Sequence, residues 1–431
     1  MKPEPASPIS RRLRSVHRPQ DLVPPLLGFL LALISAPLFA SVGSTFVSQA
    51  IPFSSGTSGS TPLQVSPPAV TTDSSNPMSA TATNRSANTI SGSVVATHAV
   101  TNPIIGINVS GAEYSWETYP TTSDLDYLKS NGITLLRVPF AWEKIQPTIY
   151  GPLSSTELGN MNAFLTALAA RGMSAIIDMH NYARYTLNWA TLDNIGTGTE
   201  GTTGSIIGSA AVPFSSFKDV WTKLAAALKG HSGLVGYDIM NEPNTMPNAC
   251  VWPTAAQAAV DGIRSVDMNT TIYVEGDNWA SASTWQTANA NLHIVDPASR
   301  LVYEAHQYFD DGSGRYTKTY DQYGATPTRG IDQLQPFLKW LKQNNAKGFV
   351  GEFGVPQDDL RWLAVLDNFI AALVANDVGG TYWQYNYRTP QGVSWWPNWH
   401  EPMSVIRIQD WGTPQLDVIK KYVQPASKGT P

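Results

Sequence analysis

Two glutamates in this sequence come directly after short apolar runs. Glu242 follows the run 234–240 within Asn241-Glu242-Pro243, and Glu352 follows the run 348–351. Two carboxyl groups in different environments can divide the work of a proton donor and a nucleophile between them. Each glutamate also has a plainer interpretation, since Asn-Glu-Pro suits a turn and Glu352 could be a structural carboxylate paired with Arg137.

Further polar and aromatic residues stand where other apolar runs end. Charged and aromatic side chains are poor choices for such positions unless they face a cleft. One histidine alone, such as His180 or His306, is more often structural than functional, but the whole series favours a common site. The series comprises Arg137, Asp178-Met179-His180-Asn181-Tyr182, Glu275-Gly276-Asp277-Asn278-Trp279, His306-Gln307-Tyr308 and Trp383.

The elements that must position these residues are predicted to be eight buried parallel strands. Near-continuous apolar runs of this length are typical of strands covered on both faces, and amphipathic segments lie between them. The runs are 104–109, 133–139, 174–179, 234–240, 271–275, 301–305, 348–351 and 378–383, and the main helical patterns are 156–171, 214–229, 255–266, 331–344 and 360–376.

Asn131-Gly132 and Arg171-Gly172 indicate helix ends. No Gly-x-Gly-x-x-Gly turn follows the first run, so nothing points to a dinucleotide fold. We expect an α/β protein with a (β/α)8 TIM barrel, in which the carboxyl ends of the strands build the site.

Taken together, the set resembles glycoside hydrolase family 5, a cellulase-type family of retaining barrel hydrolases. The resemblance spans about residues 103–386. The stretches 178–185, 206–208 and 304–309 are most similar to its endo-β-1,4-glucanases of fungi and bacteria. The residues that carry the resemblance are Arg137, His180, Asn241, Glu242, His306, Tyr308, Glu352 and Trp383.

The resemblance implies that Glu242 is the acid/base and Glu352 the nucleophile. Retention needs two carboxyls about 5–5.5 Å apart. Arg137, a permanent cation, should hold Glu352 charged, and that charge should in turn raise the pKa of Glu242. The amide of Asn241 should donate to the sugar 2-hydroxyl.

By the same resemblance, Tyr308 should bond to Glu352 and His306 should lie near Glu242. His180 and Trp383 should frame the sugar ring, and Asn181 is counted with them as a supporting contact. The resemblance implies neither a cofactor nor a metal ion.

Tryptophan side chains should make much of the contact with sugar, because flat indole faces match the apolar faces of glucose rings. Trp279 and Trp383 are the best candidates for contact with substrate. Trp221, Trp340 and Trp362, on predicted helices, should pack in the core. The tryptophans after strand ends are Trp142, Trp189, Trp279, Trp383, Trp395, Trp396 and Trp399.

The amino-terminal hundred residues differ in composition from the rest. Residues 1–40 have a basic start and then an apolar stretch, as in a cleaved secretory signal or an uncleaved membrane anchor. Residues 41–100 contain 23 Ser or Thr and only two residues with a formal charge, Asp73 and Arg85, which predicts a disordered linker. The catalytic domain should span 101–425, outside the cell and either secreted or tethered to a membrane.

Charge and cysteine content exclude several classes of partner. The net charge of −5 argues against nucleic acid. Cys250 is the sole cysteine, so neither an intrachain disulfide nor a thiolate metal site can form. We expect a polysaccharide or oligosaccharide substrate and no obligate protein partner.

The favoured function is cleavage of internal β-1,4 bonds in cellulose or related β-glucans. The alternatives are a hydrolase of mannan or xylan, an exo-acting glycosidase, and a carbohydrate-binding barrel without catalysis. Two loops leave the identity of the substrate undecided. They are 191–213, rich in Gly and Thr, and the aromatic-rich stretch 388–411, which departs from the simple family pattern.

Overall fold

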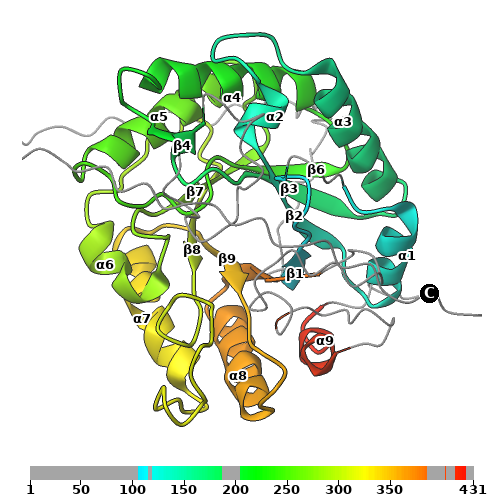
Figure 1. Cartoon of the computed structure of the whole chain (residues 1–431), viewed down its shortest axis with the longest axis vertical. Coiled ribbons are helices and arrows are strands. Elements are labelled where there is room, and N and C mark those ends of the chain that lie inside the picture. The colour runs from blue at the N-terminus through cyan, green and yellow to red at the C-terminus, as the bar shows by residue number, and fades with distance from the viewer. Residues whose placement is uncertain (1–104, 115–118, 187–203, 386–402, 404–412, 424–431) are drawn as a thin grey trace, which may run out of the picture. The chain divides into compact units, whose positions relative to one another are not determined.

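A closed barrel of parallel strands lies at the centre of the computed structural model, which describes residues 105–114, 119–186, 204–385, 403 and 413–423. Helices surround the barrel (Figure 1). The strands follow the ring in the order β1-β10-β9-β8-β7-β6-β3-β2, so each strand pairs with its neighbours in the chain, apart from an inserted hairpin. The predicted (β/α)8 barrel is confirmed.

Within the described residues the barrel has eight strands, and every predicted run overlaps one of them, with β2, β8 and β9 extending one or two residues further. The bounds are β1 Ile105–Asn108, β2 Leu135–Phe140, β3 Ser174–Met179, β6 Leu234–Asp238, β7 Thr271–Glu275, β8 Leu301–His306, β9 Gly348–Phe353 and β10 Gly379–Tyr382. Two further short strands, β4 Arg184–Tyr185 and β5 Ser205–Ile206, form an antiparallel pair after β3.

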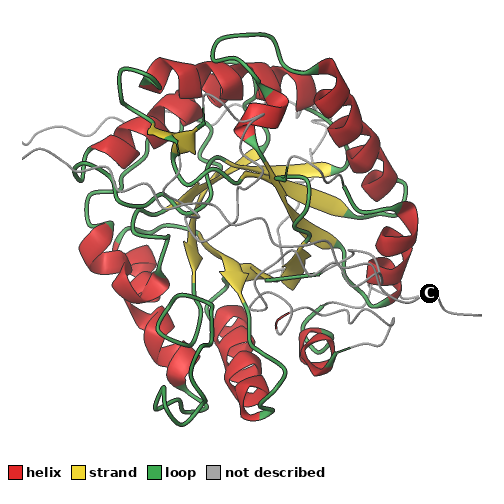
Figure 2. Ribbon diagram, in the orientation of Figure 1, coloured by secondary structure: helices red, strands yellow, loops and turns green. Residues whose placement is uncertain are grey.

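The helices lie outside the strands, as the red and yellow elements of Figure 2 show. They are α1 Thr122–Ser130, α2 Trp142–Ile145, α3 Ser155–Ala169, α4 Phe214–Leu228, α5 Val251–Arg264, η2 Ala282–Thr284, α6 Trp285–Ala288, α7 Arg329–Gln343, α8 Arg361–Ala375 and α9 Pro414–Ile419. Gly132 and Gly172 follow α1 and α3 with φ of +85° and +63°, the left-handed conformation predicted for these helix ends.

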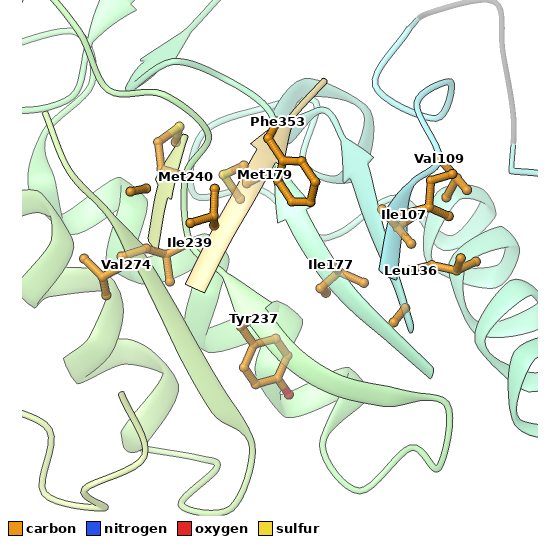
Figure 3. Packing of buried hydrophobic residues seen from close by; sticks show 14 of the residues in the cluster. Ile107, Val109, Leu136, Ile177, Met179, Tyr237, Ile239, Met240, Val274 and Phe353 are labelled. Atoms are coloured by element: carbon orange, nitrogen blue, oxygen red, sulfur yellow. The ribbon is translucent and has the colours of Figure 1, made fainter. Parts of the chain in front are cut away.

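Side chains alternate across each strand between the helices and the inside of the barrel. On the outside, residues such as Leu136 and Ile177 pack in the large buried core (Figure 3). On the inside, Leu135, Ile176 and Phe349 form a small apolar layer together with Tyr273 and Val302. Two residues further along four of these strands come Arg137, Asp178, Glu275 and Glu304, so a charged layer stands directly above an apolar floor.

Several predictions concern residues outside the described ranges. They include the signal or anchor (1–40), the linker (41–100), residues 191–203 of the first loop, Trp189, and the stretch 388–411 apart from residue 403, with Trp395, Trp396 and Trp399. Among the residues that the structure does describe, no helix combines the length and apolar character needed to cross a membrane.

Candidate active site

Glu242 and Glu352 lie close together at the carboxyl ends of β6 and β9. Oxygen atoms of the two side chains and a ring nitrogen of His306 all lie within 4.8 Å of one another. Carboxyl groups of retaining glycosidases are about 5–5.5 Å apart, and those of inverting enzymes about 6.5–9.5 Å. The spacing therefore suits direct attack by one carboxylate, as in the retaining class.

Glu352 is surrounded by groups that favour a negative charge. Its Oε1 lies 3.0 Å from Nη1 of Arg137, and its Oε2 accepts a hydrogen bond of 2.8 Å from the Tyr308 hydroxyl. Gly351 precedes it, and a Cβ at that position would overlap a carboxylate oxygen of Glu304. The chain thus needs a glycine here to bring Glu352 into the charged layer.

Glu242 has a different environment. Burial raises the pKa of its carboxyl, the hydrogen bond from His306 opposes this, and the charge of Glu352 adds to the rise. His306 Nδ1 lies 2.8 Å from Glu242 Oε1. Because the pKa of Glu242 remains raised overall, its carboxyl keeps a proton to higher pH than an ordinary glutamate and suits the role of an acid.

The side chain of Arg137 is completely buried among carboxylates from the ends of five strands. Besides Glu352, its guanidinium nitrogens lie 2.8–3.2 Å from oxygens of the other four. These four are Asp178, Asp238, Glu275 and Glu304. One cation cannot balance so many charges, and burial raises the pKa of Asp238 well above its usual value and that of Glu275 to about 7.

Asn241 is held so that one half of its amide remains available. Its Oδ1 accepts from Arg137 Nη2 at 3.0 Å. Its buried Nδ2 has no hydrogen-bond partner among the described residues. A buried amide donor without a partner is costly in a folded protein, so this group fits the predicted donor to a sugar hydroxyl.

A cavity of 670 Å³ opens above the two glutamates, and its walls include His180, Tyr308, Trp279 and Trp383. The rings of His180 and Trp383 stack with centroids 5.7 Å apart. Burial lowers the pKa of His180, but the Asp178 carboxylate outweighs it, so the pKa is raised to about 9. Trp279 is 39% exposed, which leaves its indole accessible.

Asn181 is placed differently from the other predicted site residues. It does not line this cavity. Its Oδ1 accepts from the backbone N–H of Trp142 at 2.8 Å, and its Nδ2 donates to Glu143 at 2.7 Å. Both halves of the amide thus hold the loop after β3, so any effect of Asn181 on substrate is exerted through its neighbours.

Trp142 also packs in the core, completely buried against Tyr185 and Phe217. It therefore does not contact substrate, although it follows a strand end. The prediction that Trp221, Trp340 and Trp362 are packing residues is confirmed, since all three are buried.

A wall of mostly polar residues completes the cavity and was not predicted from the sequence. The loop after β8 is shaped by Asp310, whose carboxylate accepts from the backbone N–H groups of Gly312, Gly314 and Tyr316 at 2.9, 3.1 and 3.0 Å. These residues follow no apolar run, so no periodic signal marked them. The wall is formed by Ser281, Ser283, Thr284, Asp311, Gly312, Ser313, Arg315, Thr317 and Gln333.

Three side-chain groups in the described residues are close enough to hold a metal ion. They are Glu242–His306–Glu352, Glu275–Glu304–His306 and Asp178–Asp238–Glu275. Each group includes at least one carboxylate in contact with Arg137, so a positive charge already lies beside every one of them.

The chain is similar to known cellulases over the segment that forms the barrel. A family model described as Cellulase (glycosyl hydrolase family 5) matches residues 97–389. Endo-beta-1,4-glucanase B of Aspergillus niger is 31% identical over 335 residues, which cover 74% of this chain and 89% of that protein.

Two solved structures with bound glucan fragments are also similar. The endoglucanase Cel5A of Pseudomonas stutzeri, in complex with cellobiose, is 36% identical with a TM-score of 0.65, covering 74% of this chain and 92% of the other. XacCel5A in complex with cellopentaose is 30% identical with a TM-score of 0.63, covering 74% and 99%.

Proposed function

The chain belongs to glycosyl hydrolase family 5, the cellulase family, and we propose that it cleaves internal β-1,4 bonds of a glucan with retention. The observation that carries this proposal is the placement of Glu242 and Glu352, with side-chain oxygens no more than 4.8 Å apart beneath the 670 Å³ cavity. Both carboxylates are present and differently surrounded, which argues against a barrel that only binds carbohydrate.

The two environments assign the roles in the first step. Glu242 donates its proton to the glycosidic oxygen while the Glu352 carboxylate attacks the anomeric carbon, so the bond to the leaving sugar breaks. Arg137 and Tyr308 hold the attacking carboxylate in place. Asn241 Nδ2 donates to the sugar 2-hydroxyl, a contact that strengthens as positive charge develops on the ring.

The second step reverses the proton transfer. Once Glu352 is esterified its negative charge is gone, which lowers the pKa of Glu242 and turns its carboxylate into a base. Glu242 then takes a proton from water, the water oxygen attacks the anomeric carbon, and Glu352 is released. Two successive displacements restore the β configuration.

Trp279 and Trp383 are the proposed sugar-stacking residues, with His180 beside Trp383. Their rings come from the ends of three strands and line one continuous cavity. The polar residues of the cavity supply hydroxyl and amide groups for sugar hydroxyls. We propose that an oligosaccharide lies across the barrel mouth between these two kinds of surface.

Product profiles on three polymers test the substrate and the mode of cutting. We expect carboxymethyl cellulose to lose viscosity early and to release a mixture of short cello-oligosaccharides, because an endo-acting enzyme cuts within the chain. Faster hydrolysis of glucomannan or of xylan would favour the corresponding alternative. A single short product formed without an early fall in viscosity would favour exo cutting.

We propose that the amino-terminal 100 residues are dispensable for catalysis. Residues 1–40 would act as a signal or anchor that places the enzyme outside the cell, and residues 41–100 would act as a linker. An enzyme that begins at Thr101 should fold and show the same kcat and KM on cellopentaose as the full chain. A shortened protein that is folded and soluble but inactive would contradict this division of the chain.

A further inference from the structure

One buried carboxylate beneath the site contacts the proposed acid/base directly and also contacts the histidine that bonds to it. Glu275, at the end of β7, is completely buried. Its Oε2 accepts a hydrogen bond of 2.6 Å from the backbone N–H of Glu242. Its Oε1 lies 3.2 Å from Nε2 of His306, and Nδ1 of the same ring lies 2.8 Å from Glu242 Oε1. Glu275 therefore bonds directly to the backbone of Glu242, and it is linked to the carboxyl group of Glu242 only through its ion-pair contact with the His306 ring.

The backbone of Glu242 needs such a partner. Its φ of +43° lies in the left-handed region, which a residue with a side chain adopts only when its surroundings hold it there. The hydrogen bond to Glu275 holds the N–H side of the residue, and the Asn244 amide donates to the Glu242 carbonyl oxygen at 3.0 Å. The direction of the Glu242 side chain follows from this fixed conformation.

We propose that Glu275 is the positioning residue for the acid/base, fixing the Glu242 backbone directly and its carboxyl through His306. This inference rests on the proposed function, because it concerns proton donation by Glu242. Glu275 has no place in the bond-making steps, since the cavity lies above Glu242 and Glu352.

The residue that supports Glu242 is itself bonded to an outer helix. The Trp252 indole N–H, on α5, donates to the carbonyl oxygen of Glu275 at 2.7 Å. A chain of contacts thus runs from the outer helix through the strand end to the acid/base. A displacement of the proton donor by about 1 Å is enough to cost on the order of 100-fold in rate, so this chain bears directly on catalysis.

Charged groups from several strands lie close to Glu275 and His306. Arg137 Nη2 lies 2.8 Å from Glu275, and Glu304 and Glu352 lie 3.9 and 3.6 Å from nitrogens of the His306 ring. Burial lowers the pKa of His306, but Glu275 and Glu352 outweigh it and raise it well above its usual value. The raised pKa favours the imidazolium form of the ring, which lies between the carboxyls of Glu242 and Glu275.

The positioning role needs an acceptor more than a charge. Burial raises the pKa of Glu275 to about 7, with the charges of His306 and Arg137 opposing the rise. Glutamine at this position keeps one oxygen for the Glu242 N–H, whereas methionine has a similar length and volume but no comparable acceptor. Comparison of Glu275→Gln with Glu275→Met therefore tests the hydrogen bond at nearly constant side-chain volume.

Two substrates report on proton donation. Cellopentaose has a poor leaving group and needs the acid, whereas an aryl cellobioside with a dinitrophenyl leaving group does not. For Glu275→Met we expect kcat/KM on cellopentaose to fall about 100-fold, the scale of general acid catalysis, with a much smaller loss in the first step with the aryl substrate. Glu275→Gln should recover most of the activity on cellopentaose.

Asp238→Asn is the matched control for the charged layer. Asp238 contacts the same guanidinium at 2.8 Å, and among the described residues it makes no hydrogen bond to Glu242 or His306. Burial raises the pKa of Asp238 well above its usual value, so replacing this carboxyl by an amide changes the charge of the layer less than the same change at an exposed aspartate would. This variant should keep the native ratio of the two activities.

Three outcomes would overturn the role of Glu275. They are equal losses on both substrates together with a lower Tm, no loss on either substrate, or the same selective loss in Asp238→Asn. If Glu275→Met does not fold, a selective loss must still appear in Glu275→Gln, smaller in size, and its absence overturns the role. Failure of the native enzyme to hydrolyse cellopentaose would instead contradict the proposed function. The second step with the aryl substrate, which needs Glu242 as a base, would then still report on Glu275.

Discussion

Replacing Glu352 by glycine should abolish hydrolysis of cellopentaose while the barrel stays folded. Removing a nucleophile that acts together with an acid costs on the order of 10⁴-fold or more in kcat. Arg137 keeps carboxylate partners in Asp178, Asp238, Glu275 and Glu304, so its positive charge is not left unbalanced and the fold should survive. Initial rates measured alongside circular dichroism check both halves of this expectation.

The space left by the Glu352 side chain should admit a small anion beside Arg137. Sodium azide should partly restore cleavage of the dinitrophenyl cellobioside, since azide attacks the anomeric carbon where the carboxylate stood. Sodium chloride at the same ionic strength is the control. A folded variant that retains a substantial part of native activity without azide would exclude Glu352 as the nucleophile.

Replacing Glu242 by alanine should produce a loss that depends on the leaving group. On cellopentaose kcat/KM should fall by about 10²–10⁴-fold, the usual contribution of a general acid. The first step with the dinitrophenyl substrate should be largely spared, because that group departs without a proton. The second step should become slow, so a burst of dinitrophenolate should precede the steady state.

The pH profile gives a second sign of the same role. A general acid works only while protonated, so native kcat/KM on cellopentaose should decline as pH rises through the raised pKa of Glu242. Glu242→Ala should lose this alkaline limb. An alkaline limb that persists unchanged in Glu242→Ala would show that another group donates the proton.

The barrel and the strand-end residues could be predicted because their signals are local. Parallel strands buried on both faces are continuous apolar runs, and a polar residue at the end of such a run stands out. Glu242 and Glu352 each follow a run of this kind, and Arg137 is the charged residue within one. The barrel then brings them together, since all its strands end on the same side.

Contacts between residues of different strands could not be predicted in the same way. The contact between Glu275 and Glu242 joins residues 33 positions apart, through one backbone N–H and one imidazole ring. Nothing in the sequence near Glu275 specifies that partner. The positive φ of Glu242 likewise results from packing around the loop, not from its own residue type.

Asn181 shows that two residues adjacent in the chain need not face the same site. Its place beside His180 in the polar run after the third predicted strand predicts a supporting contact with substrate. In the structure their side chains have different surroundings: His180 lines the cavity, whereas Asn181 bonds to Trp142 and Glu143. A step of one residue changes the direction of a side chain, and a run of polar residues after a strand does not reveal which of them face the cleft.

The anomeric configuration of the azide products tests the central claim most directly, that Glu352 is the nucleophile and Glu242 the acid/base of a retaining enzyme. Glu352→Gly with azide should give the α-glycosyl azide, because azide attacks once, from the face that the nucleophile occupied. Glu242→Ala with azide should give the β-glycosyl azide, because azide then replaces water in the second displacement. Proton NMR of the purified products distinguishes them. The same anomer from both variants, exchanged anomers, or inversion by the native enzyme would contradict the account.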